Sequence, residues 1–221
     1  MIPQIMIGFA TEGTTDVRFL ESIIQRTFEE VAFECESSIE VLPVQSLKKI
    51  TGKDFVDLVL EYAKTSFEHG IMVLCVHADA DEANDSNALT YKIIPAFEAV
   101  QQMRAEVCKN LAAIVPVQMT EAWMLADIDL LRREIGTSKS AHELGIAKKP
   151  ESYARPKEAI EEAIRLGRAD IPARRRHQLN IAELYQPLGQ KIQLEKLEQL
   201  AAYQKFKEAV RQAYRKLNYL H

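Results

Sequence analysis

An apolar run over residues 71–76 leads into two aspartates, Asp79 and Asp81, that are separated by one residue. The length of the run and its β-branched residues predict a strand that is buried on both faces of a parallel sheet. In open α/β sheets, ligands bind outside the carboxyl ends of the strands. Hard divalent cations such as Mg²⁺ or Mn²⁺ are held by one or two carboxylates with waters and phosphate oxygens. The pair is therefore a candidate metal site.

Two glutamates follow other expected strands in the same way. Glu12 comes after an expected strand over residues 4–10, and Glu121 comes after one over residues 111–117. Parallel strands point in one direction, so these carboxylates should share one edge of the sheet with the aspartates. Two metal ions at such an edge could stabilise the attacking and leaving oxygens of a phosphodiester. Whether the groups converge depends on the strand order, which the sequence leaves open.

The elements that must position these groups alternate along the first part of the chain. The expected strands are 4–10, 39–44, 71–76 and 111–117, and the expected helices are 17–31, 52–67, 95–108 and 119–135. This alternation predicts an α/β fold with a parallel four-stranded sheet and flanking helices. Residues 136–221 contain short helices and an amphipathic tail over 203–219. We therefore expect an α/β domain over 1–135 and a small, basic helical region over 136–221 packed on it.

The net charge of −4 combines two opposite parts. Residues 1–130 hold 9 basic and 21 acidic residues, a charge of −12, whereas residues 131–221 hold 19 and 11, a charge of +8. A metal site in an acidic part beside a basic part suits a phosphate-bearing substrate. The candidate phosphate contacts, which could equally be solvated helix ends, are Arg155, Lys157, Arg174, Arg175 and Arg176. The sequence favours neither DNA nor RNA.

Composition indicates an ordinary globular protein of the cytoplasm. No apolar run approaches the length of a membrane span, and the N-terminus lacks a signal-peptide pattern. The three cysteines, Cys35, Cys75 and Cys108, are an odd number without metal-binding spacing, so we expect free thiols in a reducing compartment.

Two residues beside the aspartates have open roles. His77 could orient a carboxylate, act as a proton shuttle or be a core histidine. Asp85 could support a second metal, although a position in a solvated loop, expected over residues 82–87, is the favoured interpretation.

The expected helix over residues 119–135 contains several polar and aromatic candidates. Glu121 and Asp127 would project about 240° apart on one helix, at about 100° per residue, so they cannot both face the site. Glu121, in the first turn, is the better candidate for a second metal. Trp123 and Met124 are expected to lie in the core.

The pattern resembles the Toprim (topoisomerase–primase) family, in which a glutamate, usually followed by glycine, comes after the first strand and Asp-x-Asp after the third. Here these are Glu12-Gly13 and Asp79-Ala80-Asp81. Segments 116–127 and 203–210 are also similar to a branch known as domain of unknown function 4276. The Toprim resemblance covers about residues 1–130, and the resemblance to the branch covers nearly the whole chain.

The resemblance implies a Toprim-like, Rossmann-like sheet and a magnesium-dependent nuclease. Glu12 would be a metal ligand or general acid/base, and Asp79 and Asp81 would be Mg²⁺ ligands, which together form the expected catalytic set. Relatives include nucleases of bacterial defence systems, some of which work beside an ATPase. Hydrolytic cleavage is favoured because no tyrosine for topoisomerase-style cleavage and no zinc motif for primase work is evident.

Other functions fit the sequence less well. A catalytically silent subunit could keep this fold and dock on a partner ATPase, and the chain could also form a homodimer. A phosphatase would need hydroxyl chemistry after the acidic pair, which Asp81-Glu82-Ala83 does not provide. A dinucleotide enzyme is disfavoured because no Gly-x-Gly-x-x-Gly follows a strand.

Overall fold

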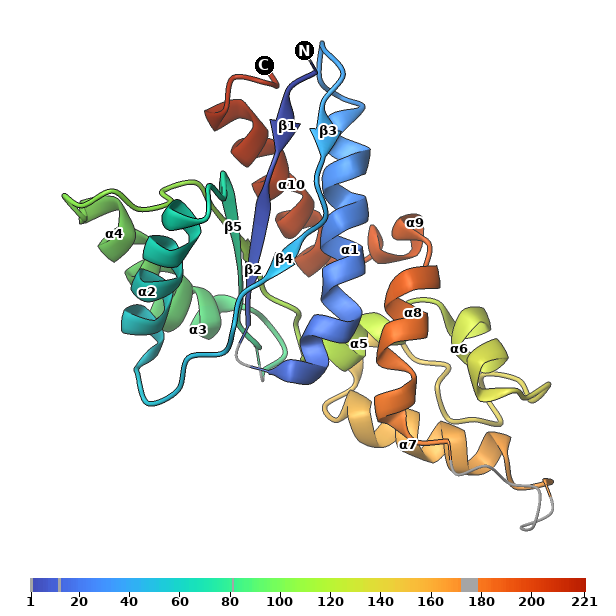
Figure 1. The fold of residues 1–221 in the computed structure, drawn as a ribbon. Helices are drawn as coiled ribbons and strands as arrows, with labels where there is room; N and C mark the ends of the chain where they lie inside the picture. The colour runs from blue at the N-terminus through green and yellow to red at the C-terminus, as the bar shows by residue number, and fades with distance from the viewer. Residues whose placement is uncertain (1, 12, 81, 172–178) are drawn as a thin grey trace.

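The computed structural model describes residues 2–11, 13–80, 82–171 and 179–221. Figure 1 shows a central sheet with helices on both sides and an extension of short helices built from the C-terminal part of the chain. The strands are β1 (Gln4–Ile5), β2 (Ile7–Ala10), β3 (Glu40–Val41), β4 (Gln45–Ser46), β5 (Val73–His77) and β6 (Leu111–Ile114). The helices of the sheet region are α1 (Thr14–Ala32), α2 (Phe55–Glu68), α3 (Ser86–Ala88), η1 (Leu89–Ile93), α4 (Ile94–Gln102) and α5 (Thr120–Met124).

The main sheet has four strands in the order β4-β2-β5-β6, and each pair of neighbouring strands is parallel. This confirms the predicted α/β fold with a four-stranded parallel sheet. The first expected strand is divided at Met6 into β1 and β2, and β1 forms a separate parallel pair with β3. The second expected strand is likewise divided, and its sheet-forming part, β4, lies just beyond the predicted range.

The side chains of β5 alternate between two hydrophobic cores. Val73 and Cys75 face a core that includes α1, whereas Leu74 and Val76 face a core that includes α2 and α4. Figure 1 shows α1 and α10 on one side of the sheet, with α2 and α4 on the other. Both faces of the strand are thus buried, which explains why its sequence is a continuous apolar run.

Two of the expected helices are wrong in extent. The helix predicted over 95–108 begins earlier, at Ser86, passes through the π-helical turn η1 and ends at Gln102. The helix predicted over 119–135 is two helices, α5 and α6 (Ile128–Ile135). Asp127 is the N-cap of α6, and its side chain accepts a hydrogen bond from the Leu130 N–H at 2.9 Å. This cap satisfies an orphan donor of the new helix, so the chain can break there.

In the C-terminal region, all regular secondary structure among the described residues is helical. Its further elements are η2 (Pro150–Ser152), α7 (Pro156–Gly167), η4 (Ile181–Glu183), α8 (Tyr185–Lys191), α9 (Leu194–Leu197) and α10 (Ala201–Lys216). As predicted, the tail is an amphipathic helix whose apolar face, with Phe206, Val210 and Tyr214, is buried. The Tyr214 hydroxyl donates to the Phe28 carbonyl at 2.9 Å, which ties α10 to α1.

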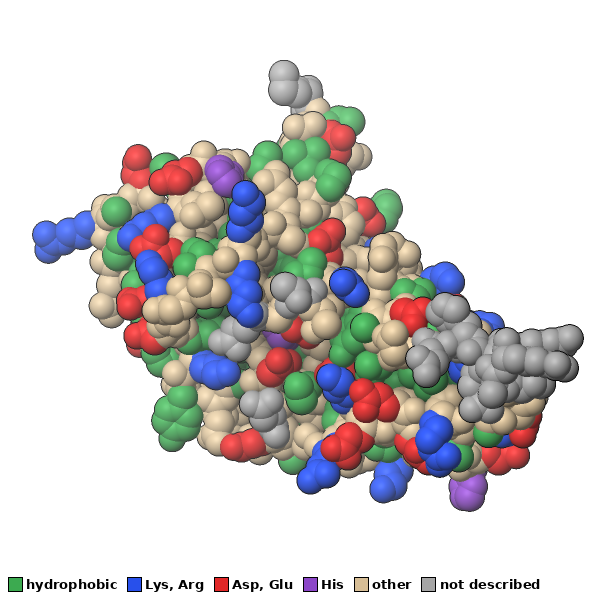
Figure 2. Space-filling view, turned by 60° about the horizontal axis from the view of Figure 1, so that its bottom comes forward, with side chains coloured by type: hydrophobic (Ala, Val, Ile, Leu, Met, Phe, Trp, Pro, Cys, Tyr) green, Lys and Arg blue, Asp and Glu red, His purple; other side chains and the backbone are tan. Residues whose placement is uncertain are grey.

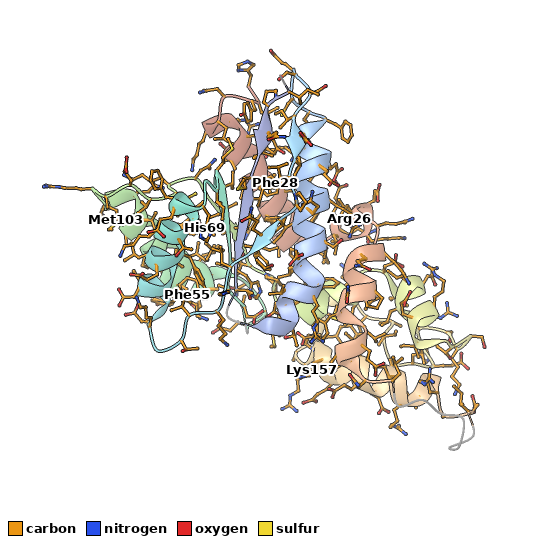
Figure 3. All side chains as sticks on the ribbon, in the orientation of Figure 1. Arg26, Phe28, Phe55, His69, Met103 and Lys157 are labelled. Carbon is orange, nitrogen blue, oxygen red and sulfur yellow. The ribbon has the colours of Figure 1, made fainter. Side chains whose placement is uncertain are left out.

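Helix α8 packs closely on α1. Gly189 of α8 allows this approach because a Cβ there would overlap the carbonyl oxygen of Phe19 and lie 2.8 Å from its Cα. Arg26 of α1 donates to the carbonyls of Gly189 and Ile192, at 2.6 Å each, and so satisfies the C-terminal end of α8. Figure 3 shows Arg26 reaching from α1 toward this helix.

Cys35, Cys75 and Cys108 are free thiols, as predicted. Among the described residues, no helix is both long and apolar enough to span a membrane.

The contact between α8 and α1 generates a stability prediction. Gly189→Ala should lower the free energy of unfolding by about 1–3 kcal/mol, because the added methyl overpacks a contact with backbone atoms that cannot rotate away. Urea denaturation measures the change. Gln190→Ala, on the exposed face of the same helix, is the matched control and should not destabilise the protein. Equal stability of Gly189→Ala and wild type would contradict the close packing.

Candidate metal centre

The strand order places a topological switch point between β2 and β5. The chain leaves β2 through α1 to reach β4 on one side, and it later returns through α2 to β5 on the other side. Because these two connections cover opposite faces of the sheet, the carboxyl ends of β2 and β5 form the kind of switch point at which α/β proteins bind ligands. Figure 2 turns this edge toward the viewer and shows acidic and basic side chains interspersed over it.

Three potential metal ligands meet at this switch point. Asp16, His77 and Asp79 each offer one ligand atom, and these atoms lie within 4.8 Å of one another. Asp16 comes from the first turn of α1, His77 is the last residue of β5, and Asp79 follows two residues later. Asp16 is 8% exposed and His77 is 1% exposed. The fold therefore brings two carboxylates and an imidazole together at the place that favours ligand binding.

The two ring nitrogens of His77 have different surroundings. Nδ1 lies 3.1 Å from the Thr11 hydroxyl oxygen, and Nε2 lies 3.3 Å from Asp79 Oδ1. The Nε2 and Oδ1 atoms are not aligned as a hydrogen bond, so both are buried polar atoms without one. A proton on Nδ1 can be donated to Thr11, which leaves the Nε2 lone pair facing the carboxylates. Metal-binding histidines commonly have this arrangement, with the second nitrogen held by a neighbouring acceptor.

Asp79 is ionised more readily than an ordinary aspartate. Burial raises its pKa, but interaction with His77, the positive charge of Lys92 and the backbone N–H of Thr120 outweigh burial, so the pKa lies below its usual value. The carboxylate is therefore charged at neutral pH and available as a ligand without releasing a proton. Buried charges need compensation by an opposite charge or by hydrogen bonds, and the Asp79 Oδ1 atom still lacks a hydrogen bond.

The turn between β6 and α5 is strained where it borders the site. Gln118 and Met119 both have positive φ, at 58° and 71°, and Met119 has ψ of 170°. The second combination is essentially restricted to glycine, and such residues persist mainly at functional sites. The turn brings the Gln118 N–H to within 2.9 Å of the Ala80 carbonyl and directs the Thr120 N–H to Asp79. It thus positions the segment that carries Asp79.

Glu121 lies beside the three ligands and has a different partner. It is 5% exposed, and its Oε1 accepts a short hydrogen bond from the Tyr185 hydroxyl of α8. Burial, followed by the hydrogen bond to Glu121 and the charges of Asp16 and Asp79, raises the pKa of Tyr185. Tyr185 therefore stays protonated and acts as a donor. The structure does not bring Glu121 into the group formed by Asp16, His77 and Asp79 among the described residues, so its role as a ligand stays a prediction.

The angle predicted between Glu121 and Asp127 is wrong because the chain breaks between α5 and α6. The two residues are on separate helices, so the angle expected on one helix does not apply, and Asp127 is used as a cap. Trp123 and Met124 are fully buried, which confirms that they are core residues. Asp85 is 7% exposed rather than solvated, and it pairs with Lys205 of α10 at 2.6 Å.

Several predicted site residues lie outside the described residues. These are Glu12, Asp81, Arg174, Arg175 and Arg176. Of the other two basic candidates, Arg155 is exposed and forms an ion pair with Glu158 at 3.4 Å, and Lys157 is exposed in the first turn of α7. Figure 3 shows Lys157 at the end of the molecule to which the carboxyl ends of the strands point.

Asp16 is the functional candidate that sequence reasoning missed. Its acidic side chain in the first turn of α1 also suits the helix dipole, so the residue type alone does not indicate a metal ligand. The signal was its place directly after the turn that follows the first strand, since the N-terminus of such a helix lies at the ligand-binding edge.

The chain was compared with known proteins in three ways. No family model, no curated protein and no solved structure matches it. The resemblance to Toprim proteins therefore stays a prediction that depends on the motifs alone.

The strained turn predicts an inverted order of stability for two substitutions. Glycine usually costs roughly 0.5–1 kcal/mol relative to alanine in regular structure. At Met119, however, glycine releases backbone strain of about 1–3 kcal/mol that alanine retains. Met119→Gly should therefore unfold at a higher urea concentration than Met119→Ala, although both lose the same packing. The usual order, with the alanine variant more stable, would show that the turn is not strained.

The position of Asp16 can be tested through Gly13, the N-cap of α1. The backbone at Gly13 is extended, a conformation that alanine adopts without strain. The Cβ of an alanine there would, however, overlap Asp16 Oδ2. Gly13→Ala should displace the Asp16 carboxylate and weaken binding of Mn²⁺ to nearly the level of Asp16→Asn, with little loss of stability. Calorimetric titration measures the affinity. Wild-type affinity in Gly13→Ala, with a weakened Asp16→Asn, would contradict this geometry.

Proposed function

We propose that this protein is a nuclease of Toprim type that cleaves phosphodiester bonds with Mg²⁺ or Mn²⁺, in bacterial defence or genome maintenance. The observation that carries the proposal is the group formed by Asp16, His77 and Asp79 at the switch point of the sheet. The Asp-x-Asp and Glu-Gly motifs support it independently, because both follow strands that end at this edge.

The residues present fit a divalent cation. The buried carboxylate of Asp16, the partly exposed carboxylate of Asp79 and the unpartnered Nε2 of His77 provide oxygen and nitrogen ligands. Thr11 can hold the ring in the required tautomer. A bound ion would stabilise the charge that develops on phosphodiester oxygens during hydrolysis. By the Toprim resemblance, Glu12 and Asp81 would join this set as ligands, with Glu12 as ligand or general acid/base.

An imidazole ligand affects the choice of ion. Mg²⁺ prefers oxygen ligands, whereas imidazole suits Zn, Cu, Fe and Ni, and carboxylates suit Mn²⁺ as well as Mg²⁺. If His77 binds the ion through Nε2, the site should have a lower affinity for Mg²⁺ than for Mn²⁺. We therefore expect Mn²⁺ to bind more tightly than Mg²⁺.

Positive charge beside the site would help to hold a polyanionic substrate. Lys92 is close enough to Asp79 to lower its pKa, and its Nζ lies 5.9 Å from the centroid of Phe55, at the end of α2 nearest this edge. Lys157 and Arg155 are exposed on α7 and could contact phosphates farther along a nucleic acid, together with the predicted cluster at 174–176. These contacts would position the substrate without reading its sequence.

Metal titration and cleavage together test the proposal. Mn²⁺ and Mg²⁺ would be titrated by calorimetry into wild type, Asp79→Asn and Asp16→Asn, and metal-dependent cleavage of DNA and RNA would be measured in parallel. Each substitution should weaken Mn²⁺ binding by at least about tenfold, since even residues that only support a ligand have effects of that size. His77→Asn should weaken Mn²⁺ more than Mg²⁺. Asp79→Asn should also abolish cleavage.

Asp85→Asn is the matched control. Asp85 is also a buried carboxylate that follows β5, but it already pairs with Lys205. It should bind Mn²⁺ like wild type. Metal binding without cleavage of any nucleic acid would instead favour a catalytically silent subunit that docks on a partner ATPase. Absence of metal binding in wild type, with and without nucleic acid, would refute both the metal site and the nuclease.

A further inference from the structure

A surface pocket of about 200 Å³ adjoins the candidate metal centre. One wall is the segment after β5, with Asp79 and Ala80, and the other is formed by the loop and helix that follow, with Asn84, Asn87 and Tyr91. Asp79 therefore belongs to both the pocket and the ligand group. A molecule in this pocket would lie directly beside an ion held by Asp79.

The helical wall of the pocket has two unusual features. It contains the π-helical turn η1, and single π turns of this kind are rare and often found at functional sites. Tyr91, within this turn, is 74% exposed although it is a large aromatic residue. Nothing in the described chain covers most of its surface, so the ring is available at the pocket to a planar ligand.

Two amide side chains supply polar recognition in the same pocket. Asn87 donates through Nδ2 to Glu82 at 2.7 Å, which leaves its Oδ1 as an acceptor. Asn84 accepts through Oδ1 from the Ser86 N–H at 3.0 Å, which leaves its amide N–H groups as donors. An acceptor and a donor beside an aromatic ring match the polar edge and the flat face of a nucleobase.

We propose that this pocket binds one unpaired base of a single-stranded nucleic acid, so that the adjacent phosphate reaches the metal centre. The proposal rests on the proposed nuclease function and adds its substrate class. Bases in single strands can stack on aromatic side chains and present their edges, whereas bases in a duplex are stacked and paired. The pocket is below the roughly 300–1,000 Å³ of typical drug-sized ligand sites, so it suits a single base rather than a larger group.

The test compares Tyr91→Ala with Tyr91→Phe, which retains the ring. Binding of fluorescein-labelled ten-nucleotide single-stranded DNA, single-stranded RNA of the same sequence and the matching DNA duplex would be measured by anisotropy in Ca²⁺. Tyr91→Ala should weaken binding of at least one single strand by roughly 5- to 150-fold, the range for loss of one stacked base. Tyr91→Phe should stay within about twofold of wild type, and the duplex should bind all variants alike.

Phe33→Ala is the matched surface control, because Phe33 is 90% exposed at the other end of α1. It should bind like wild type. The inference is overturned if Tyr91→Ala binds single strands like wild type, if Tyr91→Phe loses as much as Tyr91→Ala, or if wild type binds no single strand. Selective loss in Tyr91→Ala with no cleavage by wild type in Mn²⁺ would support the pocket and refute the nuclease. Cleavage by wild type at a rate that Tyr91→Ala leaves unchanged would support the nuclease and refute the base-binding pocket.

Discussion

The structure depends on the adjacency of two parallel strands, β2 and β5, at the centre of the sheet. Their pairing places the start of α1 beside the end of β5, and so brings Asp16 to His77 and Asp79 across more than 60 residues of sequence. It also brings the carboxylates of Asp16 and Asp79 together at a largely buried site, which is unfavourable unless cations or hydrogen bonds compensate their charge. Lys92 and the Thr120 N–H provide part of that compensation for Asp79. A divalent ion would complete it.

The C-terminal helices belong to the same arrangement. Tyr185 supplies the hydroxyl that satisfies Glu121, and the Arg26 and Gly189 contacts hold its helix on α1, which also carries Asp16. On another side, Lys205 of α10 pairs with Asp85, just after the candidate ligands of β5. One continuous hydrophobic core joins α1, α8 and α10. The helical region therefore supports the acidic edge of the sheet directly, and its displacement would leave Glu121 and Asp85 without their partners.

The sequence allowed the parallel sheet and the acidic strand end to be predicted, because the period and length of an apolar run are local properties. The apolar strand that ends at His77 and the buried Trp123 are examples. The ligand group could not be predicted in full, since it depends on which strands are neighbours. Asp16 has a sufficient local explanation as an acid in a first helical turn, and the Tyr185–Glu121 bond joins residues 64 apart. Asp127 was readable as a helix cap, but the apolar period that continues past it favoured one long helix.

Two irregular backbone segments adjoin the residues that follow β5. The turn at Gln118–Met119 holds the segment of Asp79 from the side of β6, and the π-helical turn η1 brings Tyr91 and Lys92 to the pocket that Asp79 also lines. Neither irregularity is required to form the sheet, since a relaxed turn and a regular α-helix would connect the same strands. The φ and ψ values of Met119 cost free energy, and single π turns are rare and often found at functional sites. Their joint position at one strand end is the pattern expected when local geometry serves binding at the site rather than stability of the fold.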